Sequence, residues 1–382
     1  MAWDQKTGYG RFCREIVSAL LRMPAGYSFT LLMDAEADAP ARAEAVRLIP
    51  AGDSTVRSLP NLVRLTRAIA RIRADVWFFP SPLYFVPVPT HAPVLLAIHD
   101  TIPWCYPHMI FPSYMQRMAW NIKLRLALRQ ARHLITVSGH ARDAIARYFR
   151  LPEGKINVIS EAPSAMFKPL PDAAGMASIS GRLGIPPSAR MIIYHGALAQ
   201  HKNLRTLVRV FNSLSREPAF GDLYLVIAGS QTGSNQGEFR ALRSICSGTD
   251  RVKFPGSLDD CNLVLALNRA TVAVLPSFDE GFGLTGLESV ACGTPLIATH
   301  SSALPEVLGD AAVYFHPLDE KALSANLTRL LANPDYRRTL RQRGLERTAS
   351  LSWDSSAMQL TEIFESVLAQ KVSARRFQRA AG

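Results

Sequence analysis

Cysteine is scarce in this sequence of 382 residues, and the cysteines that are present lie far apart. Their number is five, and no two of them form a Cys-x-x-Cys pair. An odd set of scattered cysteines predicts neither a disulfide framework nor a clustered zinc site. A reducing compartment, the cytoplasm, is therefore expected.

Long apolar runs are missing as well. No window reaches about 18 consecutive apolar residues, the length that a membrane-spanning helix needs. The first residues carry Asp4, Lys6, Arg11, Arg14 and Glu15 without an apolar stretch between them, so no secretory signal is predicted.

Charge is plentiful but uneven. Residues 1–170 hold 21 Lys and Arg against 12 Asp and Glu, a net charge of +9, whereas residues 171–382 hold 22 against 19, a net charge of +3. A basic first half favours an anionic partner, such as a membrane surface, a phosphorylated substrate or nucleic acid. Solubility alone is the equally good alternative.

Apolar runs of strand length alternate with amphipathic stretches of helix length in both halves, and the chain is 48% hydrophobic. Strands are expected at residues 75–79, 94–99, 133–138 and 156–160, and then at 191–195, 223–228, 271–275, 295–298 and 312–315. Helices are expected at residues 11–22, 61–73, 114–129, 140–149, 203–215, 238–247, 263–269, 284–292 and 320–332, and from residue 336 onward. This repeated alternation predicts an α/β protein with two doubly wound, Rossmann-like domains.

The most informative segment is residues 276–295, PSFDEGFGLTGLESVACGTP, where a predicted strand ends and a helix begins. Glycines allow close backbone approach, and a helix start presents N–H groups that bind anions. Glu280 and Glu288 bracket the loop, and carboxylates accept hydrogen bonds from hydroxyls. The loop therefore predicts a ligand with both phosphate and hydroxyl groups. The structural alternative is a helix cap with Glu280 near the positive helix end.

Lys202 follows the first predicted strand of the second half and stands just before a helix. A lysine in that position pairs with phosphate, although a solvated lysine in a loop is the more common case.

These motifs resemble the family-4 glycosyltransferases, the retaining group 1 enzymes of the GT-B fold. The resemblance rests on E-G-F-G-L-x-x-L-E at 280–288, A-C-G-T-P-L-I-A at 291–298 and L-P-E-V-x-G-D-A-A at 304–312. Shorter matches occur at residues 7–12, 98–100, 136–138, 201–203 and 352–354.

The resemblance implies a role for each matching residue. Glu288 would hold the ribose hydroxyls of a nucleotide sugar, and Glu280 would contact the transferred sugar. Lys202 would neutralise the diphosphate, and His99 would lie near the reacting centre. Backbone groups would approach the donor at Phe282, Gly283 and Leu284, and at Gly8 and Gly10 in an opening loop. Catalytic roles thus fall to His99, Lys202 and Glu280.

The same resemblance implies the domains: an acceptor-binding domain at 1–170, a nucleotide-sugar domain at 171–352, and a helix at 353–382 that crosses back to the first domain and ends in a basic tail. Catalysis is expected in the cleft between the domains, with retention of configuration.

The expected reaction moves mannose, glucose or rhamnose to a lipid-linked or polysaccharide acceptor in cell-envelope glycan synthesis. No cofactor and no metal are expected, and the sequence contains no Asp-x-Asp triplet. No nucleic-acid partner is expected. The enzyme would act in the cytoplasm, with peripheral contact to an anionic membrane at the inner face of the plasma membrane.

Two departures from the family pattern leave an alternative open. Only residues 1–6 precede Thr7, so the strand that opens relatives is expected to be missing, and Ala197 stands where many relatives have arginine. A non-catalytic GT-B protein that acts as a binding or scaffold partner is therefore the alternative.

Overall fold

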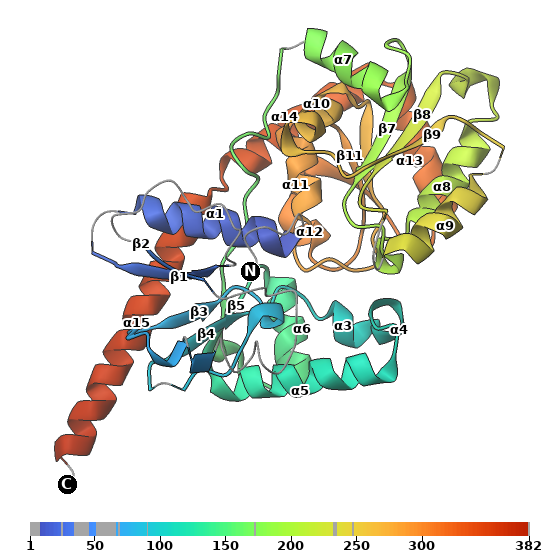
Figure 1. Cartoon of the computed structure of the whole chain (residues 1–382). Coiled ribbons are helices and arrows are strands. Elements are labelled where there is room, and N and C mark those ends of the chain that lie inside the picture. The colour runs from blue at the N-terminus through green and yellow to red at the C-terminus, as the bar shows by residue number, and fades with distance from the viewer. Residues whose placement is uncertain are drawn as a thin grey trace. The chain divides into compact units, whose positions relative to one another are not determined.

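The computed structural model describes residues 8–23, 26–33, 46–50, 66–67, 69–89, 91–171, 173–231, 235–246 and 248–380 (Figure 1). The chain forms two compact units. The first comprises Met1–Thr101, Phe111–Glu161 and Ser352–Gly382, and the second comprises Ile102–Ile110 and Ala162–Leu351. Residues 1–7, where the first strand is predicted to be missing, lie outside the described residues.

The first unit contains a parallel sheet in the order β3-β4-β5-β6 and a separate parallel pair, β1-β2. Its strands are β1 (Phe29–Met33), β2 (Val46–Pro50), β3 (Trp77–Phe79), β4 (Val94–Ala97), β5 (Ala131–Thr136) and β6 (Ile156–Val158). Its helices are α1 (Gly8–Arg22), α5 (Tyr114–Gln130), α6 (Gly139–Phe149) and α15 (Trp353–Ala380). Every residue of β4 is buried, as a strand covered on both faces requires.

The C-terminal helix α15 packs against α1 within the first unit. The Phe12 and Trp353 rings meet edge to face with centroids 5.8 Å apart, and Arg22 pairs with Asp354 at 2.6 Å. Helix α15 therefore supports the face of α1 that carries the buried Phe12.

The second unit has one six-stranded parallel sheet in the order β12-β11-β10-β7-β8-β9. Its strands are β7 (Arg190–His195), β8 (Leu223–Ala228), β9 (Val252–Gly256), β10 (Val272–Leu275), β11 (Leu296–Thr299) and β12 (Ala312–Phe315). Its helices are α3 (Ile102–Cys105), α4 (Pro107–Ile110), α7 (Ala173–Leu183), α8 (Leu204–Leu214), α9 (Gln236–Ile245), α10 (Asp260–Arg269), α11 (Leu284–Ala291), α12 (Leu304–Leu308), α13 (Glu320–Ala332) and α14 (Pro334–Ala349). The first strand, β7, lies beside the fourth, β10, so the strand order reverses between them as in dinucleotide-binding sheets.

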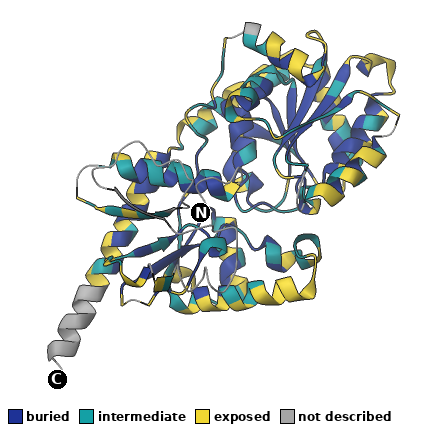
Figure 2. Ribbon diagram, viewed as in Figure 1, coloured by how far each residue is buried: buried dark blue, intermediate teal, exposed yellow. Residues whose placement is uncertain are grey.

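The predicted strands are present, most of them with shifted ends, and Figure 2 shows the strands of this sheet as mostly buried. Three strands were not predicted: β1, β2 and β9. Strand β9 (VKFPG) lies at the sheet edge, contains a proline and buries only Val252 fully, so it lacks the continuous apolar run of a central strand. The prediction of an opening loop around Gly8 and Gly10 is wrong, because both glycines lie in the first turn of α1.

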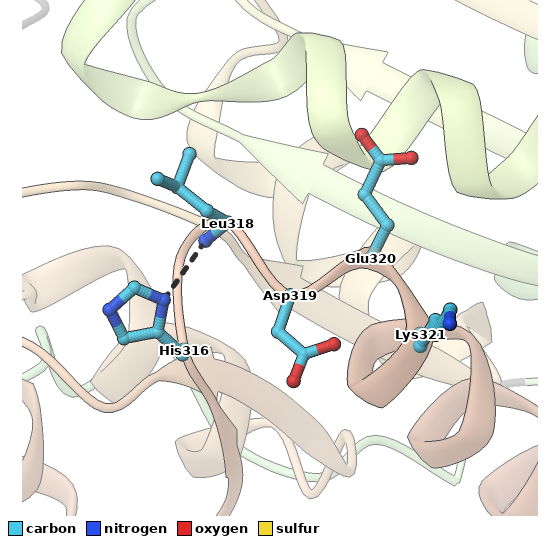
Figure 3. A pocket seen from close by; sticks show the side chains of 5 residues that line it. All are labelled: His316, Leu318, Asp319, Glu320 and Lys321. Atoms are coloured by element: carbon cyan, nitrogen blue, oxygen red, sulfur yellow. Dashed lines mark hydrogen bonds between the residues drawn. The ribbon is translucent and has the colours of Figure 1, made fainter.

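At the carboxyl edge of this sheet, the loop after β12 forms a pocket of about 470 Å³ lined by His316, Leu318, Asp319, Glu320 and Lys321 (Figure 3). Asp319 caps α13 by accepting a hydrogen bond from the Ala322 N–H at 2.9 Å. None of the site residues predicted from the sequence lines this pocket.

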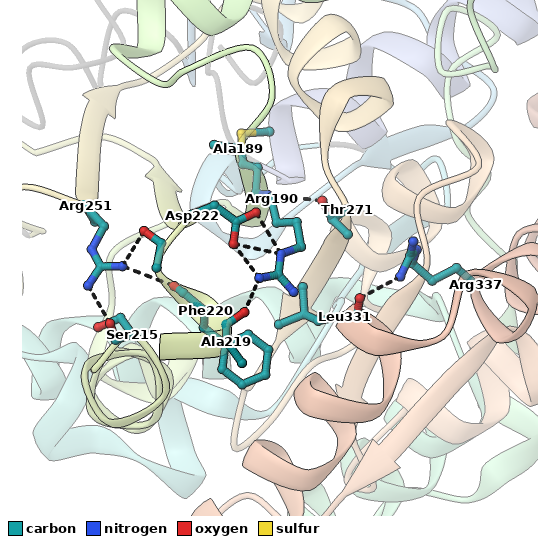
Figure 4. Close-up of polar contacts among 12 residues, drawn as sticks. Ala189, Arg190, Ser215, Ala219, Phe220, Asp222, Arg251, Thr271, Leu331 and Arg337 are labelled. Atoms are coloured by element: carbon teal, nitrogen blue, oxygen red, sulfur yellow. Dashed lines mark hydrogen bonds and ion pairs between the residues drawn. The ribbon is translucent and has the colours of Figure 1, made fainter. Parts of the chain in front are cut away.

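At the amino edge, arginines bind backbone carbonyls (Figure 4). Arg251 donates to the carbonyls of Phe220 and Gly221 at 3.1 and 2.9 Å and also to that of Ser215. Arg190 holds Asp222 in a bidentate pair. Much of the positive charge here therefore serves to hold the fold together.

Replacement of Arg251 by methionine is expected to destabilise the protein by about 1–3 kcal/mol, because three carbonyls lose a charged donor. Urea unfolding followed by circular dichroism measures this effect. The exposed Arg216 supplies the control, since its replacement by methionine should change stability by less than about 0.5 kcal/mol. Equal losses in the two variants would contradict this role for Arg251.

None of the helices in the described ranges has both the length and the apolar composition to cross a bilayer.

Candidate active site

Two predicted site residues follow the two strands at which the sheet order reverses. Lys202 ends the short turn Gln200–Lys202 after β7, and Glu280 lies in the loop after β10. Strands β7 and β10 are parallel neighbours, with Ile192 beside Val272. Their carboxyl ends therefore form the switch point where open α/β sheets bind ligands.

Lys202 and the buried Glu280 form an ion pair at this point. The Lys202 ammonium lies 2.7 and 2.8 Å from the two Glu280 carboxylate oxygens, and the side chains are 15% and 9% exposed. The Ser277 hydroxyl donates to the same carboxylate at 2.6 Å, and the Glu280 N–H donates to the Ser302 hydroxyl at 2.9 Å.

This environment keeps Glu280 ionised. Burial would raise the pKa of Glu280, but the charge and hydrogen bonds of Lys202, together with the Ser277 hydroxyl, outweigh it and hold the pKa below its usual value. The site therefore presents an oriented carboxylate and a cation whose charges balance in the absence of a ligand.

Asn203 ties the Lys202 loop to its neighbours. It has a left-handed backbone, with φ 53°, and its side-chain amide donates to the carbonyls of Pro276 and Pro317 at 3.1 and 2.8 Å. Asparagine tolerates this conformation better than most residues. These bonds fix the loops after β7, β10 and β12 to one another.

His201 is buried next to the ion pair, and its backbone carbonyl accepts the Phe278 N–H at 2.8 Å. Burial, with a smaller contribution from the charge of Lys202, lowers the pKa of His201 from 6.5 to about 4. The ring is therefore neutral at pH 7 and adds no second positive charge.

The glycine loop brings the start of α11 close to the sheet. Gly283 precedes the helix with φ 94°, and a Cβ atom there would collide with the Leu304 side chain. A Cβ atom at Gly286 would lie 3.3 Å from Leu275, Leu296 and Leu308. Phe282 is buried, and Leu284 begins the helix. The tight approach leaves the first N–H groups of α11 at the carboxyl edge, where helices bind anions.

Glu288 lies on α11 and is 3% exposed. One of its carboxylate oxygens is 3.7 Å from Nδ1 of His195, the last residue of β7. Nε2 of His195 is 3.0 Å from the Thr285 carbonyl. The His195 imidazole therefore lies between the buried Glu288 carboxylate and the Thr285 carbonyl.

The predicted residues of the first unit form their own cluster. His99 is 6% exposed; its Nδ1 is 3.4 Å from a Glu161 carboxylate oxygen, and its Nε2 is 2.9 Å from the Pro80 carbonyl. The Phe12 ring meets the imidazole edge to face at 4.6 Å. Gly8 is exposed and Gly10 buried in the first turn of α1, where the Tyr9 hydroxyl donates to Asp100 at 2.7 Å.

Three residues that hold the predicted site residues in place were not predicted from the sequence: Ser277, Asn203 and Glu161. Ser277 and Asn203 lie inside the recognised motifs, so their spacing to Glu280 and Lys202 could have revealed them. Glu161 is 62 residues from His99 in sequence, and no local pattern connects the two.

Comparison with known proteins identifies the family. The sequence model "Glycosyltransferase Family 4" matches residues 7–162, and "Glycosyl transferases group 1" matches residues 176–347. The O-antigen chain mannosyltransferase B of Escherichia coli is 28% identical over 63% of this chain, and the aligned part spans 62% of that relative's length. The O-antigen chain mannosyltransferase RfbU of Salmonella typhimurium is 25% identical over 73% of this chain and 77% of its own.

A solved structure, sucrose-phosphate synthase from Thermosynechococcus elongatus, superposes with a TM-score of 0.74 over 95% of this chain and 94% of that chain, at 23% identity. The two family matches cover both predicted halves, and the fold is that of GT-B proteins. This chain therefore belongs to the group 1 glycosyltransferases of the family-4 type.

Proposed function

We propose that this protein transfers a sugar, mannose in the first place, from a nucleotide-sugar donor to a lipid-linked or polysaccharide acceptor in cell-envelope glycan synthesis. Glucose and rhamnose are the alternative sugars. The observation that carries the proposal is the Lys202–Glu280 ion pair at the switch point of the second sheet. The names of the O-antigen mannosyltransferase relatives support the choice of sugar and acceptor.

The second unit supplies the donor contacts in this proposal. Glu288 accepts hydrogen bonds from the ribose hydroxyls, and Glu280 accepts them from the transferred sugar. Lys202 turns from Glu280 toward the diphosphate, which the N–H groups of Phe282, Gly283 and Leu284 also face. For the first unit, the family resemblance implies donor contacts by His99, Gly8 and Gly10.

The proposed chemistry needs no enzyme nucleophile. Bond cleavage places negative charge on the leaving diphosphate and positive character on the sugar. Lys202 and the oriented N–H groups stabilise the negative charge on the diphosphate, and the Glu280 carboxylate stabilises the positive character of the sugar. The acceptor hydroxyl attacks the sugar on the same face from which the diphosphate leaves, so the configuration is retained. The proton of the hydroxyl passes to the leaving diphosphate. We propose that this proceeds without a metal ion.

Calorimetric titration of the full chain with GDP, UDP and dTDP, with and without EDTA, tests the proposal. Binding of one nucleotide with the same affinity in EDTA is the expected result. Binding that EDTA abolishes would overturn the metal-free mechanism. No binding of any nucleotide would favour the non-catalytic scaffold.

Replacement of Glu288 by alanine is expected to weaken binding of that nucleotide about 10–100-fold, because a buried charged acceptor contributes about 1.5–3 kcal/mol per hydrogen bond. A ribonucleotide and its 2′-deoxy analogue are titrated against both proteins. The wild type should prefer the ribonucleotide, and the variant should lose that preference. The exposed Glu217, replaced by alanine, is the control. An unchanged preference in the Glu288 variant would remove this residue from the ribose site.

A further inference from the structure

Large apolar side chains are exposed mainly on one helix of the first unit. Among the described residues, eight such side chains are exposed, and five of them belong to α5: Tyr114, Met115, Met118, Ile122 and Leu126. Their exposed fractions run from 38% for Met118 to 73% for Tyr114. Concentration of most exposed apolar groups on a single helix marks an interaction surface.

The five side chains share one face of α5. At about 100° per residue, they fall within an arc of about 120°, with Tyr114 at one edge and Leu126 at the other. The two buried residues of the helix, Leu124 and Ala127, lie on the opposite side, toward the unit's core. Figure 2 shows exposed residues along much of α5. The helix thus has two apolar faces, and only one of them is buried in the fold.

The charge of α5 is of one sign. Its sequence, YMQRMAWNIKLRLALRQ, contains four basic residues and no acidic residue. Arg125 and Arg129 fall inside the same arc as the apolar side chains, and both are exposed. The Lys123 ammonium donates to the Leu83 carbonyl and holds the helix to the unit. The exposed surface is therefore apolar and cationic together.

We propose that this face of α5, Tyr114 to Arg129, docks on an anionic lipid bilayer, with the helix lying in the plane of the interface. Apolar side chains spaced along the whole helix enter the boundary between headgroups and acyl chains, while the arginines reach the phosphates. Charge complementarity selects an anionic surface, because no carboxylate on α5 offsets the four cations. This surface goes beyond sugar transfer and does not depend on it.

Flotation of the full chain with vesicles tests the proposal. The protein should float with vesicles of phosphatidylglycerol and phosphatidylcholine, stay unbound with phosphatidylcholine alone, and dissociate as salt rises. Replacement of Met118 and Ile122 by serine should lower the partition coefficient at least about tenfold. Replacement of Arg125 and Arg129 by glutamine should lower it about tenfold as well.

Matched controls come from other exposed side chains. Serine at Leu318 and Met358, which are 69% and 50% exposed, removes equivalent apolar groups elsewhere, and glutamine at Arg216 and Arg240 removes equivalent charge. These variants should bind vesicles like the wild type. Circular dichroism and nucleotide titration should be unchanged in all variants, which separates this surface from the donor site.

Three results would overturn the proposal. They are no binding to anionic vesicles, an equal loss of vesicle binding in the α5 and control variants, or a wild-type dimer that becomes monomeric in the Met118/Ile122 variant. The last result would assign the surface to a second copy of this chain.

Discussion

Replacement of Lys202 by methionine is expected to lower turnover of the bound nucleotide sugar by about 100–1,000-fold, the usual effect of removing one group that stabilises a developing anion. Lys202 is the cation paired with Glu280 at the switch point, at 2.7 Å. In the proposed reaction it faces the leaving diphosphate. The measurement is release of nucleoside diphosphate from the nucleotide sugar that the titration selects.

The effect of Lys202→Met on stability must be separated from its effect on turnover. Methionine at 202 leaves the carboxylate of Glu280 buried without its cation, which typically costs about 3–5 kcal/mol. A second variant that also carries Glu280→Gln removes the buried charge. We expect the double variant to regain most of the stability but none of the turnover. Recovery of turnover together with stability would show that Lys202 serves only the fold.

Acid is expected to destabilise the protein through His201. Its pKa is about 4 in the fold and 6.5 in the unfolded chain, so above pH 6.5 the ring is neutral in both states and the stability is fully present. Between these two pH values the unfolded chain binds one more proton than the folded protein, so the stability decreases as the pH is lowered. The difference amounts to about 3 kcal/mol near pH 4. Glu280, whose pKa is also lowered in the fold, adds a loss with the same sign below its unfolded value of 4.5.

The variant His201→Gln isolates this effect, because it cannot bind the proton. Urea unfolding of the wild type between about pH 4.5 and 7.5 should show the steeper loss of stability, and the variant should show the shallower one. The exposed His316, replaced by glutamine, is the control and should keep the wild-type slope. Equal slopes in wild type and His201→Gln would mean that His201 does not carry the acid sensitivity.

Most strands of the second half could be predicted from the sequence. Apolar runs of strand length predicted β7, β8, β10, β11 and β12, since burial on both faces leaves a continuous apolar run. The glycines after β10 predicted close approach, and Gly283 has a backbone that favours glycine. Strand β9 was not predicted, because an edge strand does not need a continuous apolar run.

The sequence by itself determined the alternation of strands and helices, the loops at strand ends and the residue types within them. Local periodicity records burial, and these features are local. Only the tertiary structure decided that Lys202 pairs with Glu280, 78 residues away, and that Glu161 meets His99. Those pairings depend on strand order and on how loops from separate strands approach each other. The low pKa of His201 likewise arises from burial among residues that adjoin it only in the fold.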